Sequence, residues 1–215
     1  MSRTAGTRPA RVWQRMLSGR RLDLLDPSPL DVEIEDIAHG LARVARWNGQ
    51  TRGDHAFSVA QHSLIVETLV AADGAEPRWC LAALLHDAPE YVIGDMISPF
   101  KSVMGGDYKR VEQRLQAAVN LRFGLPPSLP SSVEKAIKTA DRVSAYHEAV
   151  LLAGFAAKEA ATFFGKPAAG LVEPAAFTPV PTAATEAAFL ARFAALDATC
   201  RESQPAQDVA RAGRG

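Results

Sequence analysis

The chain is poor in cysteine, which excludes two common ways of stabilising or equipping a protein of this size. Cys80 and Cys200 are the only thiols among 215 residues. Two cysteines so far apart allow neither a disulfide framework nor a CxxC metal knuckle. Cys80 lies in an apolar run, where a buried free thiol behaves as a small hydrophobic side chain.

The chain also lacks net charge and long apolar runs. Lys and Arg total 24, as do Asp and Glu, so no overall field attracts nucleic acid or a membrane surface. No segment approaches about 18 continuous apolar residues, and the first ten residues lack the apolar core of a signal peptide. We therefore expect a soluble, cytoplasmic protein without a nucleic-acid or membrane partner. The one locally basic stretch is interpreted as an amphipathic surface helix; it contains Arg8, Arg11, Arg15, Arg20 and Arg21.

Strict apolar/polar alternation is absent, and so are internal repeats, whereas apolar residues recur at helical spacing along most of the chain. The sequence therefore predicts an all-α fold. A length of 215 residues with 47% hydrophobic residues suits one sizeable domain with a real core. We expect an N-terminal extension over 1–29, a single helical-bundle domain over 30–200 and a flexible polar tail over 201–215.

Spacing and capping patterns place the expected helices. Ser58 with Gln61, and Ser131 with Glu134, match the capping-box pattern at helix starts, and Pro77 suits a first turn. The expected helices cover 8–18, 33–47, a segment opening at 58, a central run from 77 ending in His86 and Asp87, 107–123, 131–157 and 182–199.

Four ionisable residues occupy apolar helical faces, where leaving them without partners would be costly. His62 shares a stripe with Val59 and Val66, His86 and Asp87 end the central run, and Asp141 lies on the inner stripe of the helix that opens at 131. Each alone has an ordinary structural interpretation, such as a satisfied core histidine. Together they form a set of two imidazoles and two carboxylates from three helices, which suits a divalent cation such as Co, Mn, Fe or Zn better than Mg.

The pattern H…HD…D resembles the HD-domain metal-dependent phosphohydrolases. The resemblance covers roughly Ile34 to Glu148, and its flanking residues are similar to those of the 5′-deoxynucleotidase branch, which hydrolyses deoxynucleoside 5′-monophosphates. The matching segments are Arg46-Trp47, Gln61-His62-Ser63, Leu85-His86-Asp87-Ala88-Pro89-Glu90, Gly94-Asp95 with Pro99 and Lys101, and Ala140-Asp141.

The resemblance implies roles residue by residue. Those matching the metal ligands are His62, His86, Asp87 and Asp141. Glu90 matches the acidic residue that assists the attacking water or the leaving group, and Arg46 matches a phosphate-contacting arginine. Trp47 and Asp95 match residues that line the sugar site and favour 2′-deoxy substrates.

The resemblance also implies a homo-oligomer, namely a dimer. A single metal ion is expected, because two-metal relatives use further histidines between the HD pair and the last Asp. None occurs from Ala88 to Ala140, and His147 is six residues beyond Asp141, around the helix. The loop 48–57, which contains His55, and the segment 165–181 depart from the pattern, so base preference and phosphate number stay open.

Several alternatives remain at this point. The same site could serve a nucleoside triphosphate or an alarmone, although few cations (Arg46, Arg52, Lys101) are available for extra phosphates. A non-catalytic nucleotide-binding module is a third possibility, although such modules typically lose a ligand or the acidic helper. Singly, Glu90 could be a hydrogen-bond partner of a metal-binding His, and Arg46 could face a helix C-terminus. Trp47 could be a core aromatic, and Asp95 a turn residue after Gly94.

Overall fold

A computed structural model describes residues 12–97, 103, 106–168 and 172–212. Within them the fold is predominantly α-helical, as predicted. The helices are α1 (Ile34–Leu41), α2 (Val59–Ala72), α3 (Pro77–Leu84), α4 (Glu90–Ile93), α6 (Gly106–Arg122), α7 (Ser131–Leu151), α8 (Ala157–Phe164) and α9 (Thr182–Ala212). Short 3₁₀ turns occupy Pro29–Asp31, Arg46–Gly49 and Pro174–Phe177.

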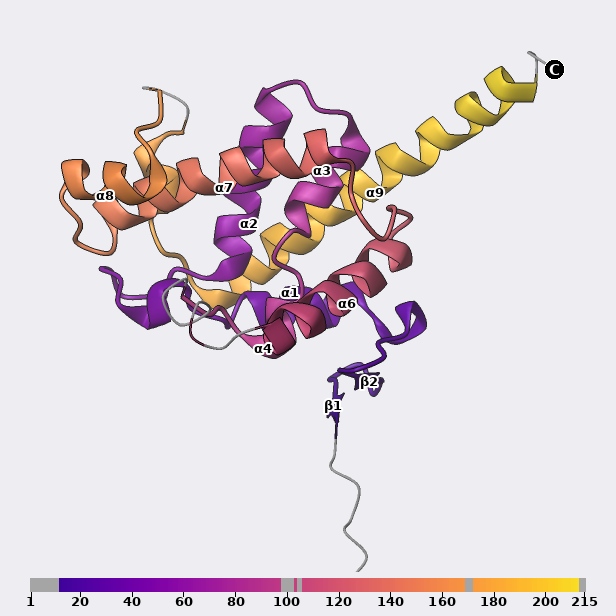
Figure 1. Ribbon diagram of the computed structural model, residues 1–215, viewed down its shortest axis with the longest axis horizontal. Helices are drawn as coiled ribbons and strands as arrows, with labels where there is room; N and C mark the ends of the chain where they lie inside the picture. Colours follow the sequence, from indigo (N-terminus) through magenta and orange to yellow (C-terminus); the bar gives the residue numbers. More distant parts are fainter. Residues whose placement is uncertain (1–11, 98–102, 104–105, 169–171, 213–215) are drawn as a thin grey trace, which may run out of the picture.

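Helix α2 lies at the centre of the bundle and packs against α3, α7 and α9. Figure 1 shows α9 crossing behind the other helices and projecting beyond them at its C-terminal end. The core between these helices is built from fully buried side chains, among them Phe57, Leu84 and Phe189. Because α2 is covered on several sides, a polar side chain on it must find its partners inside the protein.

The predicted helix over 8–18 is wrong where the structure describes it. Residues Trp13–Arg15 (β1) and Arg21–Asp23 (β2) instead form an antiparallel hairpin, and residues 8–11 lie outside the described part. Gly19 takes the left-handed φ of +88° in its turn, and Ser18 donates its hydroxyl and its backbone N–H to the buried carboxylate of Asp36. The hairpin contributes Leu22 to the common core.

Several predicted helix ends were also wrong. Helix α1 ends at Leu41 rather than near 47, because Ala45 turns to extended backbone and bridges to Ser58. Helix α7 is preceded by Pro130, with no side-chain cap from Ser131, and ends at Leu151 rather than 157. At the C-terminus, α9 continues to Ala212 through residues expected to form a flexible tail.

Other local predictions were confirmed. Ser58 Oγ accepts the backbone N–H of Gln61 and caps α2, although the Gln61 side chain bonds Thr178 and Val180 instead of completing a capping box. Among the described residues, no helix is both long and apolar enough to cross a membrane.

Candidate metal and phosphate site

His62 is completely buried on α2, and its ring is held in place through Nδ1. Its Nδ1 lies 2.6 Å from Oε1 of Glu148, and Ser144 Oγ lies 3.2 Å from the same nitrogen. A carboxylate can only accept, so Nδ1 carries the proton. The other nitrogen, Nε2, faces Asp141 Oδ1 at 3.3 Å and Asp87 Oδ2 at 3.6 Å.

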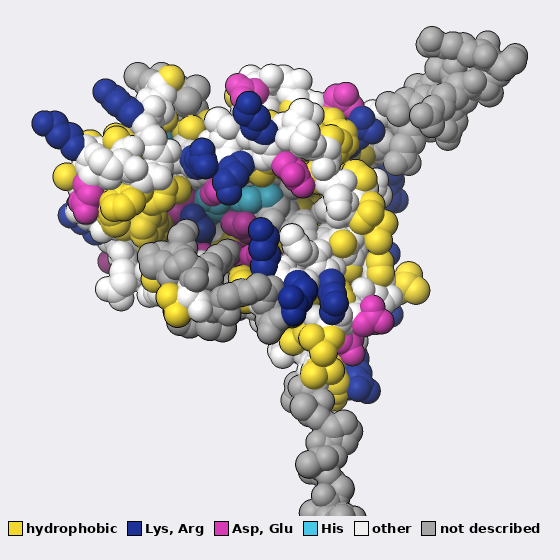
Figure 2. Space-filling model, in the orientation of Figure 1, with side chains coloured by type: hydrophobic (Ala, Val, Ile, Leu, Met, Phe, Trp, Pro, Cys, Tyr) yellow, Lys and Arg dark blue, Asp and Glu magenta, His cyan; other side chains and the backbone are white. Residues whose placement is uncertain are grey.

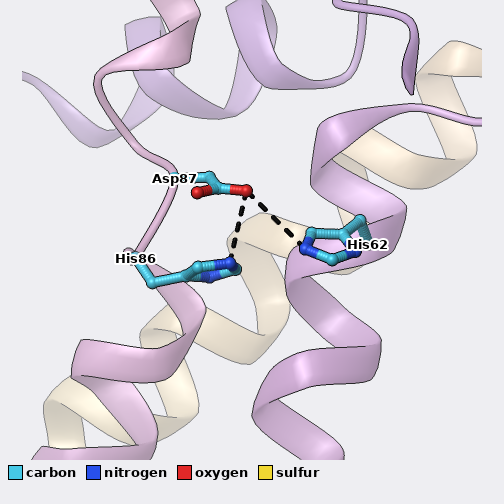
Figure 3. A group of neighbouring side chains, drawn as sticks. All are labelled: His62, His86 and Asp87. Atoms are coloured by element: carbon cyan, nitrogen blue, oxygen red, sulfur yellow. Dashed lines mark ion pairs between the residues drawn. The ribbon is translucent and has the colours of Figure 1, made fainter. Parts of the chain in front are cut away.

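His86 is oriented in the same manner by a different partner. Helix α3 ends at Leu84, and the chain turns so that His86 Nδ1 donates to the backbone carbonyl of Ala83 at 2.8 Å. Its Nε2 then points toward Asp87, whose Oδ2 lies 3.2 Å away. Figure 3 shows both imidazoles converging on the Asp87 carboxylate, which comes from the loop after α3.

The arrangement of these groups fits a metal ion. Candidate ligand atoms of His62, His86 and Asp87 all lie within 4.8 Å of one another, and Asp141 adjoins them through its contact with His62. The Nε2 atoms of both histidines are buried and face these carboxylates at ion-pair distance without a well-formed hydrogen bond, although buried polar atoms are almost always satisfied. A cation would satisfy both of them, and imidazole and carboxylate are suitable donors for first-row metals.

Electrostatics favour the charged forms around this cluster. Burial raises the pKa of Asp87, but the neighbouring imidazoles of His86 and His62 and the charge of Arg46 lower it well below its ordinary value. Burial and Arg46 lower the pKa of His62, yet the carboxylates of Glu148 and Asp141 raise it to about 10. The site without a metal therefore holds an ionised carboxylate beside a protonated imidazole.

Arg46 lies beside this cluster, held between two carboxylates. Its Nε lies 3.1 Å from Glu148 Oε2, and its Nη1 lies 3.5 Å from Asp95 Oδ2. Burial lowers the pKa of Arg46, but Glu148 and Asp95 raise it above its ordinary value, so the guanidinium stays charged. Among the described residues, the side-chain hydrogen bonds of Arg46 use Nε and Nη1, and none involves Nη2. That nitrogen is available to an anion.

Trp47 is fixed next to Arg46 by an unusual backbone conformation and by a hydrogen bond to a buried carboxylate. Trp47 and Asn48 have positive φ values of 58° and 51°, a conformation that is costly for side-chain-bearing residues and is often found at functional sites. The indole Nε1 donates to Glu148 Oε2 at 2.8 Å. The ring packs against Phe155 and Phe164, with centroids 5.6 and 6.0 Å away.

Glu90 is the first residue of α4 and is 3% exposed. The helix of the central run ends at Leu84 rather than at His86 and Asp87, and the chain forms a turn before the single helical turn that begins at Glu90. Pro89 precedes Glu90 as the N-cap, and the Glu90 N–H donates to the Asp87 carbonyl at 3.0 Å. Glu90 is therefore joined to His86 and Asp87 by this turn rather than by helical spacing.

The sequence hypothesis missed Glu148, which contacts four other side chains of the site. It is fully buried on α7 and accepts from the side chains of Arg46, Trp47, His62 and Ser144. A signal was present in the sequence, because Ser144 and Glu148 follow Asp141 at three and seven residues and so share its helical face.

Two other residues considered in the sequence analysis do not join the described site. The ring of His147 packs against Phe177, and Lys101 lies outside the described residues.

The candidate site lies in a hollow of the molecular surface. Figure 2 shows histidine side chains at the bottom of a hollow, with acidic and basic side chains around its rim. The site is therefore reachable from solvent, while the imidazole of His62 itself remains buried.

An all-α bundle that brings H…HD…D residues from three parts of the chain together is an HD-domain protein. A family model described as 5′-deoxynucleotidase YfbR-like matches residues 36–159, and the chain belongs to this family. An uncharacterized protein of Rhodobacter capsulatus is 61% identical over 184 residues, covering 85% of this chain and 94% of that protein. The uncharacterized protein YfdR of Escherichia coli is 36% identical over 106 residues, or 49% of this chain and 55% of YfdR. The family supports an HD-type phosphohydrolase that is metal-dependent.

Proposed function

We propose that this protein is a metal-dependent 5′-nucleotidase that hydrolyses deoxynucleoside 5′-monophosphates to nucleoside and phosphate. The observation that carries the proposal is the pair of buried Nε2 atoms of His62 and His86, aimed at Asp87 and lying beside a charged arginine. Family membership supports the same reaction class.

One divalent ion would be held by His62, His86, Asp87 and Asp141. When bound, such an ion supplies a hydroxide nucleophile at neutral pH and compensates the charge on a phosphoryl oxygen. In both histidines Nδ1 is committed to a hydrogen bond, with Glu148 and with Ala83, so Nε2 is the nitrogen that would face the ion. Holding both rings in advance lowers the entropic cost of assembling the site.

Arg46 would hold the phosphate through Nη2. Its other contacts, to Glu148 and Asp95, keep the guanidinium in one orientation. Guanidinium suits phosphate because its planar donors match the phosphate oxygens. Positioning of this kind contributes to the rate by holding the ester near the attacking oxygen.

Glu90 would act as the general base or general acid. Its carboxylate would take a proton from the attacking water or give one to the leaving 5′ oxygen, which is work that a buried carboxylate can do. Trp47 and Asp95 would line the sugar site, since both lie directly against or beside Arg46. The homodimer implied by the resemblance stays a prediction.

The test is phosphate release from a panel of deoxy- and ribonucleoside mono-, di- and triphosphates with Mn, Co, Zn and Mg. Release of inorganic phosphate from the monophosphates supports the proposal. Pyrophosphate or triphosphate release would instead identify a nucleoside triphosphate or alarmone hydrolase. Purified protein that binds none of the metals would point to a non-catalytic module. Asp87→Ala and Asp141→Ala should abolish the activity, and persistence of activity in either would contradict the metal assignment.

A further inference from the structure

The carboxylate of Glu148 is shared between two different sets of donors. Oε1 accepts from Ser144 Oγ at 2.8 Å and lies 2.6 Å from His62 Nδ1. Oε2 accepts from Trp47 Nε1 at 2.8 Å and from Arg46 Nε at 3.1 Å. One oxygen therefore faces the candidate metal ligand, and the other faces the candidate substrate residues.

A buried carboxylate at this position requires such a set of donors. Its side chain is 0% exposed, and an ionised group without partners would be very costly there. The four donors and the charge of Arg46 compensate that cost. A carboxylate has two accepting oxygens and no proton to donate, whereas an amide has one accepting oxygen and one donating nitrogen. The amide oxygen of a glutamine at 148 could therefore accept hydrogen bonds from only one of the two sets of donors. Its NH₂ group would face the other set, which also consists of donors.

We propose that Glu148 is the positioning residue that couples the two halves of the site, fixing the metal-binding nitrogen of His62 through Oε1 and the phosphate-binding geometry of Arg46 and Trp47 through Oε2. The inference deepens the phosphohydrolase function proposed above and rests on it. It assigns to Glu148 no contact with substrate or with the reacting atoms.

The coupling follows from the rigidity of one carboxylate. Its two oxygens move together, so a rotation that lengthens the bond to His62 also displaces the acceptor of Arg46 and Trp47. Cation binding at Nε2 makes the Nδ1–H a stronger donor to Oε1 and so holds the carboxylate in the orientation that Arg46 needs. By linkage, an anion on Arg46 must then strengthen cation binding to the same extent.

Glu148→Gln is the decisive variant because it preserves size and shape. We expect Co²⁺ affinity to fall by about 10- to 100-fold, as is usual when the partner of a metal-binding His is lost. The dissociation constant of inorganic phosphate, and the KM for nucleoside monophosphate, should rise by about tenfold, which is the effect of losing one charge-assisted hydrogen bond. Co²⁺ and phosphate are titrated separately by calorimetry, and kcat and KM are measured at saturating metal.

Two single-sided variants separate the oxygens. Ser144→Ala removes a donor to Oε1 only and should weaken Co²⁺ binding more than phosphate binding. Trp47→Phe removes a donor to Oε2 only, while leaving an aromatic ring, and should weaken phosphate binding more than Co²⁺ binding. Glu67→Gln is the matched control: Glu67 is equally buried and lies on α2 with His62, but pairs with Arg192 of α9. It should lower the Tm and leave both affinities unchanged.

The outcomes are decisive in either direction. A folded Glu148→Gln protein that keeps both affinities, or loses only one of them, overturns the coupling. If circular dichroism shows that this variant does not fold, the two single-sided variants decide: opposite preferences support the proposal, and wild-type affinities in both overturn it. Absence of phosphate release by the wild-type protein would contradict the proposed function, yet the Co²⁺ and phosphate titrations would still test the role of Glu148.

Discussion

Gly40 of α1 lies directly against Tyr91 of α4. A Cβ added at position 40 would lie 2.7 Å from the Cβ of Tyr91 and 3.0 Å from its carbonyl oxygen. Helix α4 is only four residues long and begins with Glu90. The close approach of these two helices therefore determines where the carboxylate proposed for proton transfer lies.

Gly40→Ala should reduce both stability and activity. The new methyl would overlap the Tyr91 side chain and backbone, and overpacking of this kind costs about 1–3 kcal/mol. Displacement of α4 should lower kcat further than the loss of stability explains. The measurements are Tm and phosphate release below the unfolding transition.

Gly74→Ala is the control for this prediction. Gly74 follows α2 with a φ of +80°, and a Cβ added there would meet no neighbouring atom within 4 Å. Alanine there should cost about 1 kcal/mol through backbone conformation alone. If both variants retained full activity at a matched fraction folded, α4 would not position Glu90 through this contact.

Glu90→Gln should lower kcat by about 10²- to 10⁴-fold, because a positioned general acid or base typically contributes that much. The KM and the Co²⁺ affinity should change little, since Glu90 is assigned neither phosphate nor metal. A loss of Co²⁺ affinity with an unchanged kcat at saturating metal would identify Glu90 as a partner of a metal-binding histidine instead. Steady-state kinetics and calorimetry with the same preparation distinguish the two.

Metal binding should release a proton from His62. Its pKa of about 10 in the metal-free protein lies above the ordinary value, so at pH 7 the imidazole is protonated and a cation must displace the proton. Affinity should rise about tenfold per pH unit up to about pH 10. Calorimetry in buffers of different ionisation enthalpy measures the released proton. A pH-independent affinity with no proton release would contradict the assignment of His62.

The same shift predicts how the stability of the metal-free protein depends on pH. Because the folded-state pKa of His62 is raised from 6.5 to about 10, its contribution is fully present below the unfolded value and is lost as the pH rises through the folded one. The Tm of metal-free protein should therefore fall between about pH 7 and pH 10. Glu148→Gln should reduce this slope, because it removes one of the two carboxylates that hold the proton.

Discrimination between deoxy and ribo substrates should depend on Trp47 and Asp95. Trp47→Ala and Asp95→Ala should each bring the ratio of kcat/KM for the two sugars closer to one, since both side chains are assigned to the sugar site. Asp95 also pairs with Arg46, so its loss should raise KM for both substrates, and the ratio is the informative quantity. An unchanged ratio in both variants would remove the sugar-site assignment.

The class of fold and the ionisable residues that meet in the site could be predicted from the order of the amino acids. Helical spacing is a local property, so the stripes carrying His62 and Asp141 were visible without any tertiary contact. The pairing of two imidazoles with two carboxylates on buried faces then required a common partner, and the structure brings all four residues together.

The features that depend on distant partners emerged only from the folded chain. The hairpin at 13–23 is held by Asp36 and by burial of Leu22, neither of which is visible in its own sequence. The turn between α3 and α4, which carries His86 and Asp87 and leads to Glu90, could not be read from an apolar run. Glu148 needed Arg46 and Trp47, about a hundred residues away, to stand out from other helical glutamates. Local sequence specifies what a segment can form, whereas the partner of a buried charge is specified only by packing.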